Sequence, residues 1–424
     1  MKVCVGLDFG TSGARAIALS PTAQILNEQA IAYSTPQEAR DPLVWKAALF
    51  ELIGGIPQEL KSQLEAIAIN GTSSTVLLCD VRGQPLLPPM MYGDNGDRAL
   101  LQQLETVAPP HSCVLSASSS LVKLLTFQTQ PEREKARYFL HQADWLAFLL
   151  HGQLGISDYH NSLKLGYDPA TESYPAWFAA PLLQPLATLL PKVLPPGSLM
   201  GRVSPAIAAR LALPLSCQLR AGTTDSIAAF LASGAVKPGE AVTSLGSTLV
   251  LKLLSQQRVD CAEYGIYSHR LGHLWLAGGA SNTGGAVLAR FFSVEALTQL
   301  SQKIDPTRES LLHYYPLLTP GERFPVNQPD LQPQLEPRPA DDVEFLQGLL
   351  DSMARIEAKG YALLERLGAS PLQQVLTAGG GAKNEIWRLM RQRHLKVPVC
   401  ASPHQQAAYG TALLAAGQSA RTSE

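Results

Sequence analysis

The chain has 424 residues, about two to three times the length of an average domain, so two core-forming domains are expected. Hydrophobic residues make up 46% and charged residues only 16%, a composition typical of well-buried globular proteins. The formal net charge of -1 and the lack of any Lys/Arg block argue against nucleic acid and anionic membrane as partners.

The start of the chain and its cysteines bear on the compartment. A strand-like pattern begins at Val3, which leaves no room for a signal or transit peptide, and no apolar run approaches the roughly 18 residues of a membrane helix. The six cysteines are scattered without a Cys-x-x-Cys pair, so neither a disulfide framework nor a zinc site is expected. We therefore predict a soluble, cytoplasmic protein.

The first half of the chain alternates between strand-like and helix-like patterns. The opening VCVGLDFGTSGARAIALS predicts strand, tight turn and strand, with Gly10 and Gly13 in the turn. Residues 43–64 are expected to be helical, and 66–70 to form a buried strand. Further helices are expected at LVKLLTF and at 141–152, the latter ending at Gly152. This alternation indicates an α/β fold.

Near residue 240 the opening pattern returns. GEAVTSLGSTLVLKLL again predicts strand, Gly-Ser-Thr turn and strand. Aligning the turns places Ser244 opposite Asp8, which indicates a duplicated domain in which one copy kept an acidic residue. Chance similarity over so short a stretch is the alternative.

The last part of the chain combines a proline-rich segment with a long helix. Residues 304–341 are predicted to be extended loop. The helix that follows has apolar residues at steps of three and four and ends at Gly368. VLTAGGGAKNEIWRLM predicts strand, glycine turn and helix, and HQQAAYGTALLAAG has small residues that permit close helix packing.

Phosphoryl transfer requires a cradle for the phosphates, a metal ion, a placed acceptor hydroxyl and a base. The chain has neither a Gly-x4-Gly-Lys-Ser/Thr loop nor a protein-kinase catalytic loop. Instead it has two Gly/Thr/Ser hairpins, at 10–12 and 246–248, whose backbone N–H groups and hydroxyls can converge on a phosphate. Either hairpin alone would be interpreted as an ordinary turn, but two matched copies, one of them following Asp8, favour phosphate binding.

Two acidic residues are the candidates for the chemistry. Asp8 ends an apolar strand, where a carboxylate is costly unless it is paired or binds Mg²⁺; a turn-capping Asp is the alternative. Asp225 follows a Gly-Thr-Thr turn and begins an Ala-rich helix, which suits either a helix cap or a general base. Arg15 either reaches a phosphate or is a solvated strand residue.

A glycine-rich turn at 377–388 is a candidate surface for adenine. Flat backbone at TAGGGAKNEIWR can lie against a ring, and Asn384 and Trp387 are three residues apart on one helix face. By itself this segment also fits a plain loop.

Together these segments resemble the FGGY carbohydrate kinase family, within the actin–hexokinase–Hsp70 ATPase superfamily. The resemblance covers nearly the whole chain and follows the family's order. It rests on DFGTSGAR, DSIAAF, LGSTLVL, AGGGAKNEIWR, RGQPLLPPMMYGDNGDRA, ADWLAFLLHGQLGISDYHNSLKLGYD, GGASNTGGAV, PGERFP and AAYGTALLAA.

The resemblance implies a fold and a role for each matched residue. The fold would be two ribonuclease-H-like α/β domains with a cleft between them: an N-terminal sugar-binding domain at 1–232, onto which a C-terminal helix at 405–424 packs back, and a nucleotide-binding domain at 233–404. ATP and Mg²⁺ would be the cofactors. Asp225 would be the catalytic base, and Asp8 would serve Mg²⁺, through water, and the acceptor hydroxyl. The implied ATP-binding residues are Gly10, Thr11, Ser12, Arg15, Gly246, Ser247, Thr248, Gly380, Gly381, Asn384 and Trp387.

Residues 70–80 bear on which sugar is the substrate. The family's xylulose kinases usually carry a Met-His pair where NGTSSTVLLCD has Ser73 and Ser74, and this departure favours D-ribulose over D-xylulose. The compact length also resembles the xylulose-kinase-like proteins of cyanobacteria and plastids, which favour D-ribulose. Ser73, Ser74, Asp8, Asp225 and Ser226 would then contact the sugar. Both serines could instead be ordinary loop residues.

Two other classes remain as alternatives to a sugar kinase. An Hsp70- or actin-like ATPase would share the hairpins, but the chain has no peptide-binding domain and carries the FGGY-type segments. A silent sugar sensor would be expected to lack Asp8 or Asp225, or to carry a DNA-binding helix-turn-helix. The sequence leaves the oligomeric state open.

Overall fold

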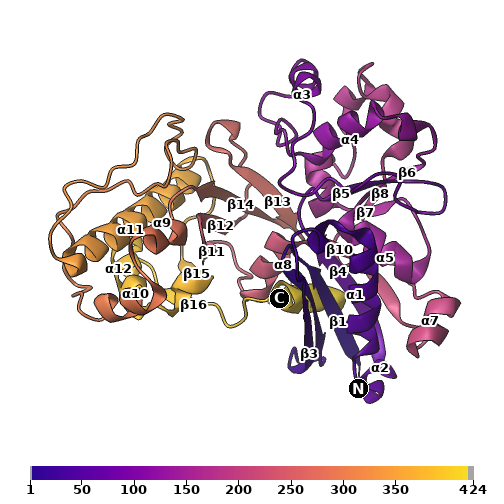
Figure 1. Cartoon of the computed structure of the whole chain (residues 1–424), viewed down its shortest axis with the longest axis horizontal. Helices are drawn as coiled ribbons and strands as arrows, with labels where there is room; N and C mark the ends of the chain where they lie inside the picture. The colour runs from indigo at the N-terminus through magenta and orange to yellow at the C-terminus, as the bar shows by residue number, and fades with distance from the viewer. Residues whose placement is uncertain (1, 419–424) are drawn as a thin grey trace. The chain divides into compact units, whose positions relative to one another are not determined.

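The computed structural model describes residues 2–418, which form two compact units (Figure 1). The first unit comprises residues 2–232 and 406–418, and the second comprises 233–405. Each unit is built around one six-stranded sheet. The C-terminal helix α13 (Ala407–Ala415) belongs to the first unit, and the part of the predicted 405–424 helix beyond residue 418 lies outside the described residues.

The first sheet places three parallel strands next to a β-hairpin. Its order is β3 (Ile25–Ala32), β2 (Gly13–Leu19), β1 (Val3–Phe9), β4 (Leu64–Gly71), β10 (Gln218–Thr224) and β9 (Leu199–Arg202). Strands β1, β4 and β10 are parallel, and β2 returns antiparallel to β1. The predicted strand–turn–strand opening and the predicted strand at 66–70 are both confirmed.

Helices cover both faces of this sheet because side chains of β1 alternate in direction. Val5 and Leu7 join a core with Trp45 of α1 (Pro42–Gly54) and Trp145 of α5 (Gln142–His151), whose rings stack edge to face at 6.4 Å. On the other face α13 packs against β1. A Cβ on Gly6 would meet the carbonyl oxygen of Ala408 at 2.2 Å, so the close approach of this helix requires glycine.

Two of the three helices expected in the first half of the chain are confirmed, and the third is divided into two. The helix expected at 141–152 is α5, which ends at Gly152 in a left-handed conformation. The single helix expected at 43–64 is instead two, α1 and α2 (Gln58–Lys61), because Gly54, Gly55 and Pro57 interrupt it. The remaining elements are β5 (Val76–Cys79), β6 (Tyr138–His141), β7 (Ile156–Asp158), β8 (Lys192–Leu194), α3 (Arg98–Glu105), α4 (Ser120–Gln128), α6 (Tyr159–Ser162), α7 (Pro205–Leu211) and α8 (Asp225–Ala232).

The second sheet repeats the topology of the first. Its order is β13 (Tyr267–Leu271), β14 (Leu274–Ser281), β12 (Leu249–Ser255), β11 (Glu240–Leu245), β15 (Gln374–Ala378) and β16 (Val399–Ala401). Strands β11, β15 and β16 are parallel, and β12 returns antiparallel to β11. Five strands therefore correspond in order and direction, with β11 in the place of β1, which confirms the α/β fold and agrees with the inferred duplication.

A long helix forms much of the second core. Helix α11 (Asp342–Arg366) confirms the long helix that the sequence pattern predicted, and it begins after Asp341, whose carboxylate accepts from the Val343 N–H. It packs with α12 (Glu385–Leu395), while α9 (Gly285–Phe291) and α10 (Val294–Ser301) precede the segment 304–341, which forms no helix or longer strand.

A buried ion pair links four elements of this unit. The Arg391 guanidinium donates to both carboxylate oxygens of Glu357 at 2.6 and 2.7 Å, and each side chain is 1% exposed. Thr243 on β11 and Thr377 on β15 complete the network. The pair thus joins α11 and α12 to the two strands that lead into the hairpin at 246–248 and the glycine turn.

The cysteines and the lengths of the helices bear on two expectations from the sequence. All six cysteines are free thiols, in agreement with the prediction of no disulfide framework. Among the described residues, none of the helices combines the length and the apolar character that crossing a bilayer would require.

Candidate active site

The carboxyl ends of the three parallel strands of the first unit gather most of its predicted site residues. Asp8 on β1 lies beside Asn70 on β4, and Gly71 lies beside Thr224 on β10. Asp225 follows Thr224 directly and is the first residue of α8. The sheet register therefore brings Asp8 and Asp225 to one edge, although they lie 217 positions apart in the sequence.

The surroundings of Asp8 favour its neutral form. Burial and the negative charge of Asp225 raise the pKa of the Asp8 carboxyl to about 6, while Arg15 and a hydrogen bond with Asn70 act in the opposite direction. Arg15 is the cross-strand neighbour of Asp8 and is exposed. Two carboxylates this close, with one arginine nearby, are the arrangement expected where a cation binds.

Asn70 is a site residue that the sequence analysis did not single out. Its Nδ2 donates to Thr411 Oγ1 of α13 at 2.6 Å, so the C-terminal helix holds the asparagine that bonds Asp8. The signal was present in the sequence, because AIAIN ends a buried strand on a polar residue.

Asp225 is half-buried at the start of α8. One of its carboxylate oxygens accepts from the N–H of Ser226 at 2.7 Å, and Ser226 itself is exposed. The N-terminal end of a helix stabilises negative charge, which keeps a carboxylate there available as a proton acceptor. Asp225 therefore lies at the same sheet edge as Asp8, with its carboxylate at the N-terminal end of a helix.

The first hairpin presents its turn to solvent. The Gly10 N–H donates to the Gly13 carbonyl at 3.0 Å, and Thr11 and Ser12 are exposed. A Cβ on Gly13 would lie 2.2 Å from the Ile31 carbonyl oxygen, so the turn can approach β3 only with glycine at this position. The hydroxyls of Thr11 and Ser12 thus lie on a tight turn that begins two residues after Asp8.

Three buried polar atoms without a partner surround the turn after β4. They are Ser74 Oγ, Gln142 Nε2 and Thr224 Oγ1, each on a residue that is 1% exposed. Thr224 pairs with Gly71, and a Cβ on Gly71 would lie 2.8 Å from Gln142 Oε1. Ser73 is half-buried beside them. Buried polar groups are normally hydrogen-bonded, so this set fits a ligand that carries several hydroxyls.

The second unit presents its counterpart edge without an acidic pair. Gly246, Ser247 and Thr248 are exposed, and the Gly246 N–H donates to the Thr248 carbonyl at 3.2 Å. The first turn of α9 is fastened to this hairpin, because the Gly285 N–H donates to Gly246 O at 2.8 Å. The hairpin is therefore held from behind while its outer groups stay open.

The glycine turn follows β15 at the same edge. Gly379 has φ +86°, and a Cβ there would lie 2.6 Å from the Leu245 carbonyl oxygen. Gly380 is exposed with open space around it, and Gly381 covers the ring of Trp387. The turn therefore offers bare backbone on its outer side, which suits the face of a planar ring.

Asn384 and Trp387 shape this turn from inside. Asn384 caps α12 by accepting from the Trp387 N–H, and its amide donates to Ser301 Oγ on α10 at 2.8 Å. Trp387 is 3% exposed, and its indole N–H donates to the Leu350 carbonyl. Both side chains form hydrogen bonds within the protein, so their direct contact with a nucleotide stays a prediction.

Two buried hydroxyls make the edge of the second unit suitable for a polar ligand. Thr283 Oγ1, just after β14, and Ser402 Oγ, just after β16, have no hydrogen-bond partner. Gly284 lies against the 246–248 hairpin, since a Cβ there would be 2.7 Å from Ser247 O. Unpaired hydroxyls, an exposed hairpin and a bare glycine turn together fit the phosphates and base of a nucleotide.

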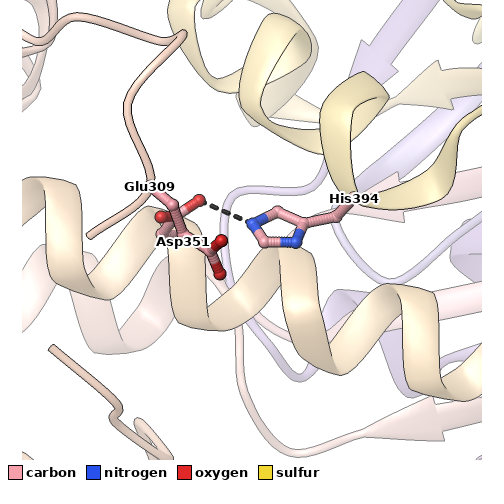
Figure 2. A group of neighbouring side chains, drawn as sticks. All are labelled: Glu309, Asp351 and His394. Carbon is pink, nitrogen blue, oxygen red and sulfur yellow. Dashed lines mark hydrogen bonds and ion pairs between the residues drawn. The ribbon is translucent and has the colours of Figure 1, made fainter. Parts of the chain in front are cut away.

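A second group of ionisable residues lies away from this edge. Glu309, Asp351 and His394 gather between α11, α12 and the 304–341 segment (Figure 2). One oxygen of Asp351 bonds His394 Nε2 at 2.7 Å and Arg393, and the other accepts from the Ser310 N–H at 2.6 Å. Because donors occupy both oxygens, this cluster ties the segment to the helices and does not suit a metal ion.

Comparison with known families identifies both units. The description "FGGY family of carbohydrate kinases, N-terminal domain" matches residues 3–232, and the corresponding C-terminal domain matches residues 241–419. Together the two matches cover nearly the whole chain.

Individual relatives are distant but aligned over most of their length. A gluconokinase of Bacillus subtilis (strain 168) is 20% identical over 431 residues, covering 91% of this chain and 81% of that protein. A xylulose kinase of Escherichia coli (strain K12) is 24% identical, covering 91% of this chain and 83% of that protein. The crystal structure of xylulose kinase from Rhodospirillum rubrum has the same fold, with a TM-score of 0.83 at 20% identity over 100% of this chain and 91% of that one.

Proposed function

Since the chain belongs to the FGGY family of carbohydrate kinases, an ATP-dependent family, we propose that it phosphorylates D-ribulose to D-ribulose 5-phosphate. The observation that carries this proposal is the edge of the first sheet, where Asp8 lies near the end of β1, Asp225 follows β10, and the unpaired polar atoms of Ser74, Gln142 and Thr224 belong to residues at or around the ends of β4 and β10. A proton acceptor next to several unsatisfied hydroxyl partners is what a polyol phosphorylation site requires.

Asp225 acts as the general base. Its carboxylate accepts the proton of the attacking sugar hydroxyl, whose oxygen forms a bond to the γ-phosphorus as the bond to the ADP oxygen breaks. The bond from the Ser226 N–H orients the carboxylate at the start of α8.

Asp8 would hold Mg²⁺ and would orient the same hydroxyl. When bound, MgATP supplies the transferred phosphoryl group and the metal charge that offsets the phosphates. A carboxylate whose pKa is raised by burial and by Asp225 gains a counter-charge when the cation arrives, which supports this assignment.

Each unit, taken by itself, carries groups that suit a nucleotide. Thr11, Ser12 and the backbone of Gly10 offer hydroxyls and N–H groups for phosphate oxygens, with Arg15 as a nearby positive charge. In the second unit Gly246, Ser247 and Thr248 offer the same chemistry. The adenosine is assigned to the outer side of Gly380 and Gly381, which Asn384 and Trp387 support from within.

The sugar is assigned to Ser73, Ser74 and Ser226, together with Gln142 and Thr224. Hydroxyl and amide groups suit the hydroxyls of a ketopentose, and the two serines replace the Met-His pair usual in xylulose kinases of the family. D-Xylulose is the alternative substrate, favoured by the names of relatives such as the E. coli protein. The six free thiols agree with a reducing cytoplasm as the compartment.

The test is coupled ADP release with MgATP against D-ribulose, D-xylulose, D-gluconate, glycerol and a blank without sugar. We expect strong stimulation by D-ribulose. Stimulation by D-xylulose or D-gluconate alone would keep the kinase class but overturn the substrate assignment. No stimulation by any acceptor, with steady ATP hydrolysis, would favour an actin- or Hsp70-like ATPase.

A further inference from the structure

Lys123 is a fully buried lysine that the reaction described above does not use. It lies on α4 between the apolar residues Val122 and Leu124, and its exposed fraction is 0%. Its Nζ donates to two main-chain carbonyl oxygens, that of Ser74 at 2.8 Å and that of Met91 at 2.6 Å. The first bond ends within the turn at 72–75, and the second ends on the neighbouring segment, where the Tyr92 N–H donates to Thr75 Oγ1.

The turn that Lys123 holds has an unusual backbone. Ser74 has φ +61°, a left-handed conformation that is unfavourable for a residue with a side chain unless its surroundings fix it. The turn is also held by the Thr75 N–H, which donates to the Thr72 carbonyl, and by the pair of threonine hydroxyls at 2.5 Å. The bond from Lys123 is the one that reaches Ser74 itself.

A charge at this place is costly for the fold. Burial lowers the pKa of Lys123 to about 8, although the nearby carboxylate of Asp94 opposes the shift. Lys164 and Arg40 add positive charge around it. Asp94 accepts from the Met91 N–H and pairs with Arg40, so it also belongs to the Met91 segment. A methionine of similar length would fill the same apolar space without this cost, which indicates that the ammonium group serves a purpose beyond packing.

We propose that Lys123 is the positioning residue of the sugar site: through its bond to the Ser74 carbonyl it fixes the turn at 72–75 so that the Ser74 hydroxyl is presented to the substrate. This inference rests on the proposed function, because it gives Ser74 a hydroxyl of the sugar as its partner. Lys123 itself touches no substrate.

The test compares Lys123→Met with the unaltered enzyme and with Lys135→Met, which removes an exposed lysine. We expect Lys123→Met to raise KM for D-ribulose about 10- to 100-fold, the range for losing a hydrogen bond to a charged group, with KM for ATP and kcat changed much less. Lys135→Met should leave all three constants unchanged.

A double-mutant cycle separates positioning from a general structural effect. If Lys123 acts through Ser74, Lys123→Met should add little to the KM of Ser74→Ala. Full additivity, or a Lys123→Met enzyme with unchanged KM for the sugar, would overturn the inference while leaving the proposed function intact. Should Lys123→Met not fold, Lys123→Gln takes its place; failure of both to fold would assign Lys123 to stability and also overturn it. An unaltered enzyme that no sugar stimulates would remove the proposed function itself.

Discussion

The two sheets present the same turn with different chemistry beside it. In the first unit the residue two positions before the hairpin is Asp8, with Asn70 on the parallel neighbour and Arg15 across the strand pair. In the second unit the same positions hold Ser244, Ala378 and Val250. The comparison shows that the duplicated fold supplies the hairpin, whereas a few side chains decide which copy carries charge.

Because of this difference we propose different roles for the two units. The first edge has two carboxylates and unpaired polar atoms, which suit proton transfer and a polyol. The second has backbone N–H groups and hydroxyls, with Ser244 in the place of Asp8, which suits anionic phosphates that a carboxylate at this position would repel. Substitutions in each unit test these proposed roles.

The largest effect is expected for Asp225→Asn. Loss of the general base should lower the sugar-dependent rate by about 10²–10⁴-fold, while the affinity for ATP changes little. Steady-state rates with the preferred sugar, together with nucleotide binding by calorimetry, check this. A variant with full turnover would remove Asp225 from the mechanism.

The next effect concerns the buried ion pair behind the second hairpin. Glu357→Leu would leave the Arg391 guanidinium buried and unpaired, so the free energy of unfolding should fall by about 3–5 kcal/mol. Chemical denaturation measures this change. The matched control is Glu357→Leu combined with Arg391→Met, which should recover most of the loss. A small effect of the single change would show that Arg391 finds another partner.

A smaller effect with a defined pH dependence is expected for Asp8→Asn. The folded-state pKa of Asp8 is raised to about 6, so its contribution to stability is present at low pH and is lost as the pH rises through about 6. The variant should therefore be more stable than the natural protein at neutral pH, by up to about 3 kcal/mol, and this gain should shrink toward pH 4.

The same substitution should lower the activity, although it raises the stability. Asp8→Asn should lose Mg²⁺-dependent turnover despite its higher stability, because the amide cannot offset the charge of the metal. Thermal unfolding at several pH values and an Mg²⁺ titration of the rate check both halves. A stabilised variant with unchanged Mg²⁺ dependence would contradict the metal role of Asp8.

The smallest effect is expected from giving the second unit an acidic residue. Ser244→Asp would place a half-buried carboxylate between Val250 and Ala378, without the asparagine and arginine that Asp8 has, at a cost of about 1–3 kcal/mol in stability. KM for ATP should rise through repulsion of the phosphates. Ser244→Asn is the neutral control, and equal constants for the two variants would refute the electrostatic reasoning.

Local patterns predicted the parts of the fold that local sequence controls. The two hairpins, the strand at 66–70 and the long helix ending near Gly368 followed from apolar periodicity and glycine placement. The break between α1 and α2 was missed because the apolar pattern continues across Gly54 and Gly55.

The missed site residues have a common physical cause. Asn70 bonds a residue 341 positions away, and Lys123 reaches a carbonyl 49 positions away, contacts that no local pattern encodes. Gln142 and Thr224 stand out only once burial and the absence of a partner are known. Likewise the inward direction of Trp387 depends on α11, which supplies the carbonyl for its indole N–H.

The most direct test of the central claim follows the γ-phosphoryl group of ATP. Radiolabelled ATP would be incubated with D-ribulose and either the unaltered enzyme or Asp225→Asn, and the products separated. We expect label in the sugar phosphate with the unaltered enzyme and almost none with the variant. Label in inorganic phosphate alone, at the same rate with and without any sugar, would contradict it.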